Sequence, residues 1–95
     1  MPNSEFTLDA VEAAAVGTEK PMHGKPGAVM IEGSGFTGTW ELQVRMQGMT
    51  YVAIGSGSGD DQLQIPGGWD YARVEVTAVS AGSLTARINR ETNEF

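Results

Sequence analysis

Residues 39–47 read TWELQVRMQ, and this stretch decides the fold class. Apolar and polar side chains alternate through it with the period of two that is typical of a half-buried strand. The side chains predicted to face the core are Trp40, Leu42, Val44 and Met46. The alternation stops at Gln47-Gly48, where glycine permits the positive φ of a tight hairpin, and strand-forming residues resume at 50–54. We therefore expect two antiparallel neighbouring strands.

A second alternating run, YARVEVTA, covers residues 71–78. Its inward-facing side chains are predicted to be Ala72, Val74, Val76 and Ala78. The segment Ser80-Ala81-Gly82-Ser83 is typical of a turn, and alternation returns at residues 84–89. Residues 71–89 are therefore predicted to form a second hairpin.

Shorter strands are predicted around these two hairpins. One covers residues 28–32 and ends at Gly33-Ser34-Gly35; another covers residues 62–65 and is stopped by Pro66-Gly67-Gly68. A further strand begins at Phe6-Thr7-Leu8. Residues 9–16 fit either a short helix, through the capping box Asp9-Ala10-Val11-Glu12, or a continuation of that strand. We favour a long, bent strand, because the alternation of residues 6–10 runs straight into the segment.

The regular spacing of these strands predicts an antiparallel β-sandwich of about seven to eight strands, Ig-like or jelly-roll-like. The 95 residues suit a single domain, 1–95. Within it, residues 17–27 contain two prolines and two lysines and are predicted to be a crossing loop or an extended arm, and residues 90–95 a polar tail.

The charge of the chain excludes some partners. A net charge of −6 argues against binding to nucleic-acid backbones and to anionic membranes. The amino terminus lacks the basic and apolar regions of a secretion signal, so we expect synthesis in the cytoplasm without a signal peptide. The absence of cysteine fits a cytoplasmic origin, and it also fits later work outside the cell.

The motifs that suggest chemistry are weak. Residues 55–61, GSGSGDD, lack the following helix of a phosphate loop and the regularly spaced oxygens of a calcium loop, although Asp60 and Asp61 leave incidental metal binding open. His23 is the only imidazole and stands in a loop without a serine signature. We therefore expect no catalytic residue, no cofactor and no structural metal, and we expect the protein not to be an enzyme.

Several residues are candidates for contact with other proteins. Trp40 is predicted to be core, whereas Trp69 follows a glycine turn at a strand entry and is either structural or available for contact. Arg73 is expected to form an ion pair with Glu75 or Glu41. The interface candidates are Phe6, Lys20, Met22, His23, Lys25, Trp69, Tyr71 and Phe95.

Five segments of the chain share the pattern of a known family. They are FTLDAVEAAAVG, VMIEGSGFTGTWELQV, MQGMTYVAIG, IPGGWDYARVEVT and GSLTARIN. Through them the chain resembles the small β-sandwich virion structural proteins of tailed bacteriophages, of the capsid decoration or cement type. The family's strand-turn-strand unit usually carries an aspartate-glycine turn and a tryptophan. This chain has Gln47-Gly48 and Tyr51 at those places, which preserves the turn and the aromatic.

The resemblance implies a module that docks on the outer surface of the assembled phage head and stabilises the shell. Its implied partners are the major capsid protein and neighbouring copies of itself, as a dimer or trimer. A tail, collar or fibre-attachment module of the virion is an alternative. A second is a carbohydrate-binding module in which Trp69, Tyr71 and Tyr51 would stack on a glycan. A non-viral adhesion domain is a third.

Overall fold

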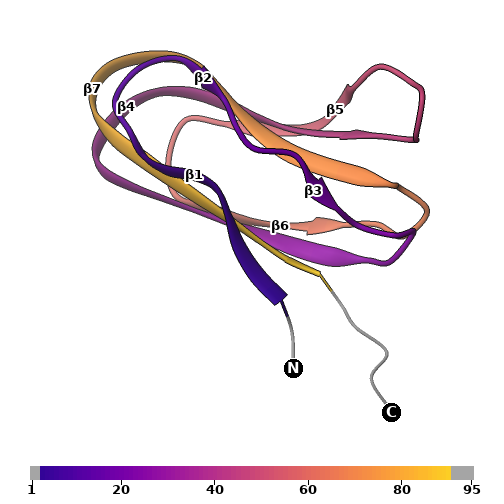
Figure 1. The fold of residues 1–95 in the computed structure, drawn as a ribbon. Coiled ribbons are helices and arrows are strands. Elements are labelled where there is room, and N and C mark those ends of the chain that lie inside the picture. The colour runs from indigo at the N-terminus through magenta and orange to yellow at the C-terminus, as the bar shows by residue number, and fades with distance from the viewer. Residues whose placement is uncertain (1–2, 91–95) are drawn as a thin grey trace.

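A computed structural model of the chain describes residues 3–90, which form seven strands and no helix (Figure 1). The strands are β1 (Asn3–Val11), β2 (Ala15–Val16), β3 (Lys20–Pro21), β4 (Gly27–Arg45), β5 (Val52–Gly57), β6 (Asp61–Ile65) and β7 (Tyr71–Arg90). All strand pairs are antiparallel and belong to one sheet. The prediction of an all-β, antiparallel domain is confirmed.

Two long strands organise the sheet. β4 and β7 pair along their whole lengths, from Gly27 opposite Arg90 to Arg45 opposite Tyr71. The register shifts three times between Ser34 and Trp40, and at this point both strands bend. The bends fold the sheet so that its two halves face each other, as the left side of Figure 1 shows.

Each half gains its outer strands from the shorter elements. β1 and β6 flank the half that contains the start of β4 and the end of β7. β2, β3 and β5 flank the other half. The core lies between the halves and takes Val29, Ile31 and Leu84 from the first and Leu42 and Val74 from the second. Alternation along β4 and β7 places these apolar side chains inward because successive strand residues face opposite sides.

The glycine-rich segments predicted to end strands are bends instead. Residues 80–83 do not close a hairpin, because β7 continues through them and pairs with β4 on both sides. Residues 33–35 likewise lie inside β4. Gly35 and Gly82 both have positive φ, 62° and 73°, and their backbones are in close contact where the two strands bend. A glycine with positive φ is found in strand bends as well as in tight turns, so the local sequence does not distinguish a bend from a turn.

Other sequence predictions are confirmed. β4 and β5 form the expected hairpin around Gly48, and β6 covers residues 61–65 and ends before Pro66. The segment 9–16 contains no helix, but the expected long strand is interrupted at residues 12–14, between the end of β1 and β2. Trp40 is buried and donates from Nε1 to the carbonyl oxygen of Gly59 at 2.9 Å. Met46 was predicted to be buried and is exposed, because it lies beyond the end of β4 in the hairpin turn.

Residues 17–27, expected to be a crossing loop or an arm, run along the edge of β7. Gly17 donates to the carbonyl oxygen of Val74 at 2.9 Å, β3 pairs with β7, and the side chain of Met22 is fully buried, with 0% of its surface exposed. The segment therefore belongs to the folded domain. Of the expected polar tail, Arg90 is the last residue of β7, and residues 91–95 lie outside the described part of the chain.

Candidate docking surface

Three connections meet at the end of the domain opposite the bends, on the right in Figure 1. They are residues 22–26, 46–51 and 66–70. The amide of Met22 donates to the carbonyl oxygen of Asp70 at 2.7 Å, and the amide of Asp70 donates to the carbonyl oxygen of Arg45 at 3.0 Å. These bonds tie the three connections together, and we call this region the hairpin end.

The tight turn between β4 and β5 is an exposed part of the hairpin end. Met49 closes the turn by donating to the carbonyl oxygen of Met46 at 3.0 Å, and Gly48 has a φ of 80°. The side chains of Met46 and Met49 are 50% and 65% exposed. Residues 46–59 carry no charged side chain, in a chain of net charge −6. The turn therefore presents an apolar, uncharged tip to its surroundings.

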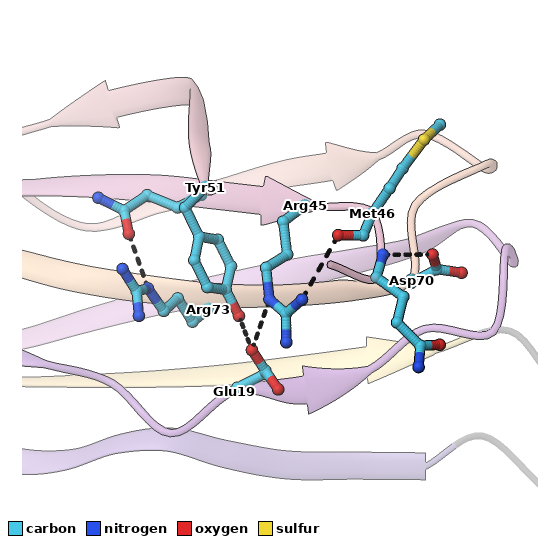
Figure 2. Close-up of polar contacts among 8 residues, drawn as sticks. Glu19, Arg45, Met46, Tyr51, Asp70 and Arg73 are labelled. Carbon is cyan, nitrogen blue, oxygen red and sulfur yellow. Dashed lines mark hydrogen bonds and ion pairs between the residues drawn. The ribbon is translucent and has the colours of Figure 1, made fainter. Parts of the chain in front are cut away.

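A network of partly buried polar side chains lies beneath this tip (Figure 2). Arg45, the last residue of β4, donates from Nε to Oε1 of Glu19 at 2.9 Å, and the Tyr51 hydroxyl donates to the same carboxylate oxygen. The hydrogen bond from Arg45, followed by that from Tyr51, lowers the pKa of the Glu19 carboxyl from its ordinary value. Partial burial, together with the hydrogen bond to Glu19, raises the pKa of Tyr51 to about 12. Glu19 is therefore ionised and Tyr51 protonated at neutral pH.

The network also fixes the turn itself. Arg45 donates from one terminal nitrogen to the carbonyl oxygen of Met46 at 3.4 Å, and Oδ2 of Asp70 accepts a hydrogen bond from the amide of Gln47 at 2.7 Å (Figure 2). The backbone on the β4 side of the turn is thus held by side chains from β4 and from the connection before β7. A turn held in this way loses little conformational freedom when it binds a partner.

A polar ladder continues across the outer face of this half of the sheet. Arg73 donates from Nε to the side-chain oxygen of Gln43 at 2.8 Å, and the Gln43 amide donates to Glu75 at 2.8 Å and to Glu41 at 3.1 Å. Arg73 was expected to pair with one of these glutamates directly; it reaches them through Gln43. Its guanidinium lies 3.7 Å from the ring centroid of Tyr51, which joins the ladder to the hairpin.

The structure places three of the eight interface candidates in the connections of the hairpin end: His23, Lys25 and Trp69. Two more, Lys20 and Tyr71, lie in the strands that adjoin it.

Of the remaining three candidates, Met22 begins one of these connections, but its side chain belongs to the core and has no exposed surface to offer a partner. Phe6 is on the outer face of the other half, where Arg87 lies 4.5 Å from its ring centroid. Phe95 lies outside the described residues.

The aromatic rings proposed for glycan stacking already have partners. The guanidinium of Arg45 lies 4.3 Å from the ring centroid of Tyr71, and that of Arg73 lies over Tyr51. Trp69 is half-buried and packs against the core. One face of each tyrosine ring is thus covered by an arginine of the same domain.

Sequence reasoning missed the exposed residues of the hairpin, Met46, Met49, Val52 and Ile54. A usable signal was present: a run without charge, 46–59, in an otherwise acidic chain. It also missed Glu19, which lies 26 residues from Arg45 and 32 from Tyr51 along the chain. No local pattern reports contacts at such separations.

The residues considered for metal or acid–base chemistry are dispersed. Across residues 3–90, no three histidine, aspartate or glutamate side chains gather in a way that could hold a metal ion. Oδ1 of Asp60 accepts a hydrogen bond from the amide of Gly33 at 2.8 Å, and Oδ1 of Asp61 accepts one from the amide of Gln62 at 2.7 Å. His23 is exposed in its loop. The same described part contains no helix long and apolar enough to cross a membrane.

The fold and this surface together define a small all-β domain, built on two bent strands, that presents a braced apolar hairpin. A solved structure, that of the SPBc2 prophage-derived protein YomS, is similar in fold, with a TM-score of 0.79. The alignment covers 94% of this chain and 92% of that one at 14% sequence identity, so the likeness concerns the fold. No family model and no curated protein matches the chain.

Proposed function

We propose that the chain is a structural protein of a tailed-phage particle, a decoration module that docks on the outside of the assembled head and stabilises the shell. The observation that carries the proposal is the braced hairpin tip, with Met46 and Met49 exposed in a run, residues 46–59, that itself contains no charged side chain. The fold likeness to a prophage-derived protein supports a phage origin. The resemblance of the sequence to virion β-sandwich proteins supports the decoration role.

The tip suits protein contact better than any other chemistry. Methionine side chains adapt to an irregular apolar surface, and they are enriched in the cores of protein interfaces. Because Arg45 and Asp70 hold the backbone of the turn, docking would order few additional groups. Like-charge repulsion between the acidic chain and an acidic partner would also be smallest at this uncharged segment.

The stabilising effect follows from mass action. A module whose docking site exists only on the assembled, expanded shell binds that state and no other, so binding shifts the equilibrium toward the intact shell. The major capsid protein is the expected partner. The work done by the module is binding, and it uses no catalytic group, cofactor or metal.

The test is cosedimentation of the purified protein with expanded, empty head shells of the phage that encodes it. We expect the wild type to pellet with shells and the double variant Met46→Lys/Met49→Lys to lose more than about tenfold in affinity, because two contact side chains gain charges. Met30→Lys is the matched control, since Met30 is 48% exposed and lies on the other half of the sheet.

Two results would contradict the proposal: no binding of the wild type to expanded shells, or an equal loss with Met30→Lys. Copy number per particle separates decoration from a tail or collar role. A decoration protein is present in proportion to the capsid subunits, whereas a collar component is limited to one symmetric ring at a vertex.

A further inference from the structure

We infer that the exposed edge of β5 is a pairing surface for a second copy of the chain, with the two β5 strands antiparallel about a twofold axis. The edges of the sheet, the exposure of β5 side chains and the distribution of charge favour this pairing. The isolated protein would form it whatever its role in a phage particle.

The edge strands of the sheet differ in how they are protected. β1 contains Asp9 and two register shifts, β2 is two residues long, β3 ends in Pro21, and β6 begins with Asp61. Charges, prolines and bulges are the features by which natural sheets prevent unwanted edge pairing. β5 pairs with β4 on one side and contains neither a charged residue nor a proline.

The side chains of β5 are more exposed than their position in the sheet would suggest. Val52 pairs with Val44, which is fully buried, so both face the inside of the sandwich. Val52 is nevertheless 47% exposed. Ile54 lies at the register shift of β5 and is 40% exposed. Two β-branched apolar side chains are thus uncovered on one edge.

The charge distribution favours a second copy as the partner. Two chains of net charge −6 repel each other, and the repulsion is smallest where residues 46–59 face each other, because they carry no charge. A twofold contact requires only that one surface complement itself, and an uncharged apolar strand edge meets this requirement. Antiparallel pairing would bring Val52 and Ile54 of both copies into one apolar interface.

The pairing has a consequence that rests on the proposed function. Antiparallel β5 strands place the two hairpin tips at opposite ends of the dimer. One dimer then has two docking tips and would bridge separate sites on the shell, so that two weak contacts act together.

Sedimentation equilibrium of the purified full chain tests the pairing. We expect the wild type to reach twice its mass of 10.1 kDa with rising concentration, and Val52→Lys/Ile54→Lys to remain monomeric. The control Met30→Lys adds a charge at an equally exposed methionine away from β5 and should dimerise like the wild type. Circular dichroism reports whether each variant is folded.

A second measurement avoids reliance on the lysine variant. In hydrogen exchange of the wild type, amides of residues 52–57 should become more protected as protein concentration rises, while those of β1 should not. A monomeric wild type, unchanged exchange in β5, or a folded Val52→Lys/Ile54→Lys variant that still dimerises would overturn the inference. Failure to bind shells would leave the dimer intact and would count against the proposed function alone.

Discussion

Replacing Gly82 with alanine tests the bend on which the fold depends. Gly82 has a φ of 73°, and a Cβ added there would lie 2.2 Å from the carbonyl oxygen of Gly35 on β4. Gly48, in the hairpin turn, has a similar φ of 80°, yet a Cβ added there would meet no atom within 4 Å. The two glycines thus share a backbone conformation and differ in their surroundings.

The expected cost of each substitution follows from this difference. Both variants place an L side chain in the left-handed region, which costs about 1–2 kcal/mol. Gly82→Ala must also separate two packed backbones, and overpacking of this kind costs about 1–3 kcal/mol more. Against a total stability of about 5–15 kcal/mol for a domain, Gly82→Ala should lower the free energy of unfolding markedly, and Gly48→Ala moderately.

Urea denaturation followed by circular dichroism gives the two free energies of unfolding. We expect Gly82→Ala to be the less stable variant by about 1–3 kcal/mol, with the m-value unchanged if unfolding stays two-state. Equal losses in the two variants would refute the reasoning. That result would be expected if residues 80–83 formed an exposed hairpin turn, with no carbonyl of β4 beside Gly82.

Three further substitutions test the core and the network. Met22→Ala should destabilise the domain by about 2–5 kcal/mol because it leaves a cavity, whereas Met30→Ala on the surface should change stability by less than about 0.5 kcal/mol, as measured by thermal unfolding. The wild type should lose stability as pH rises from 10 toward 12, and Tyr51→Phe should not show this loss. The raised pKa of Tyr51 means that the protonated hydroxyl stabilises the folded state, and this stabilisation disappears as the hydroxyl ionises. A similar alkaline loss in both proteins would contradict the assignment. Glu19→Gln should make stability fall less steeply as pH is lowered below 4.5. The lowered pKa of Glu19 stabilises the fold above its unfolded value of 4.5, and this contribution is lost as pH falls through the lower pKa of the folded state. An unchanged dependence of stability on acid pH would show that the Glu19 contacts contribute nothing to stability.

The local sequence was sufficient to predict which side chains each long strand buries. The period of two at residues 39–45 and 71–76 reports which side chains face inward, because that pattern reflects burial residue by residue. The hairpin around Gly48 was also predictable, since a turn of few residues is determined by its own backbone requirements. The all-β, antiparallel fold class follows from these local features together.

Only the tertiary structure decided how the strands pair and what the surface presents. Gly35 and Gly82 have the same local signature as turn glycines, but long-range pairing of β4 with β7 makes each of them a bend. Glu19 joins Arg45 and Tyr51 because the edge of β7 carries residues 17–21 past the hairpin, a contact that no short-range pattern encodes. Side-chain periodicity records burial within a strand, whereas the choice of partner strand depends on the packing of the whole chain.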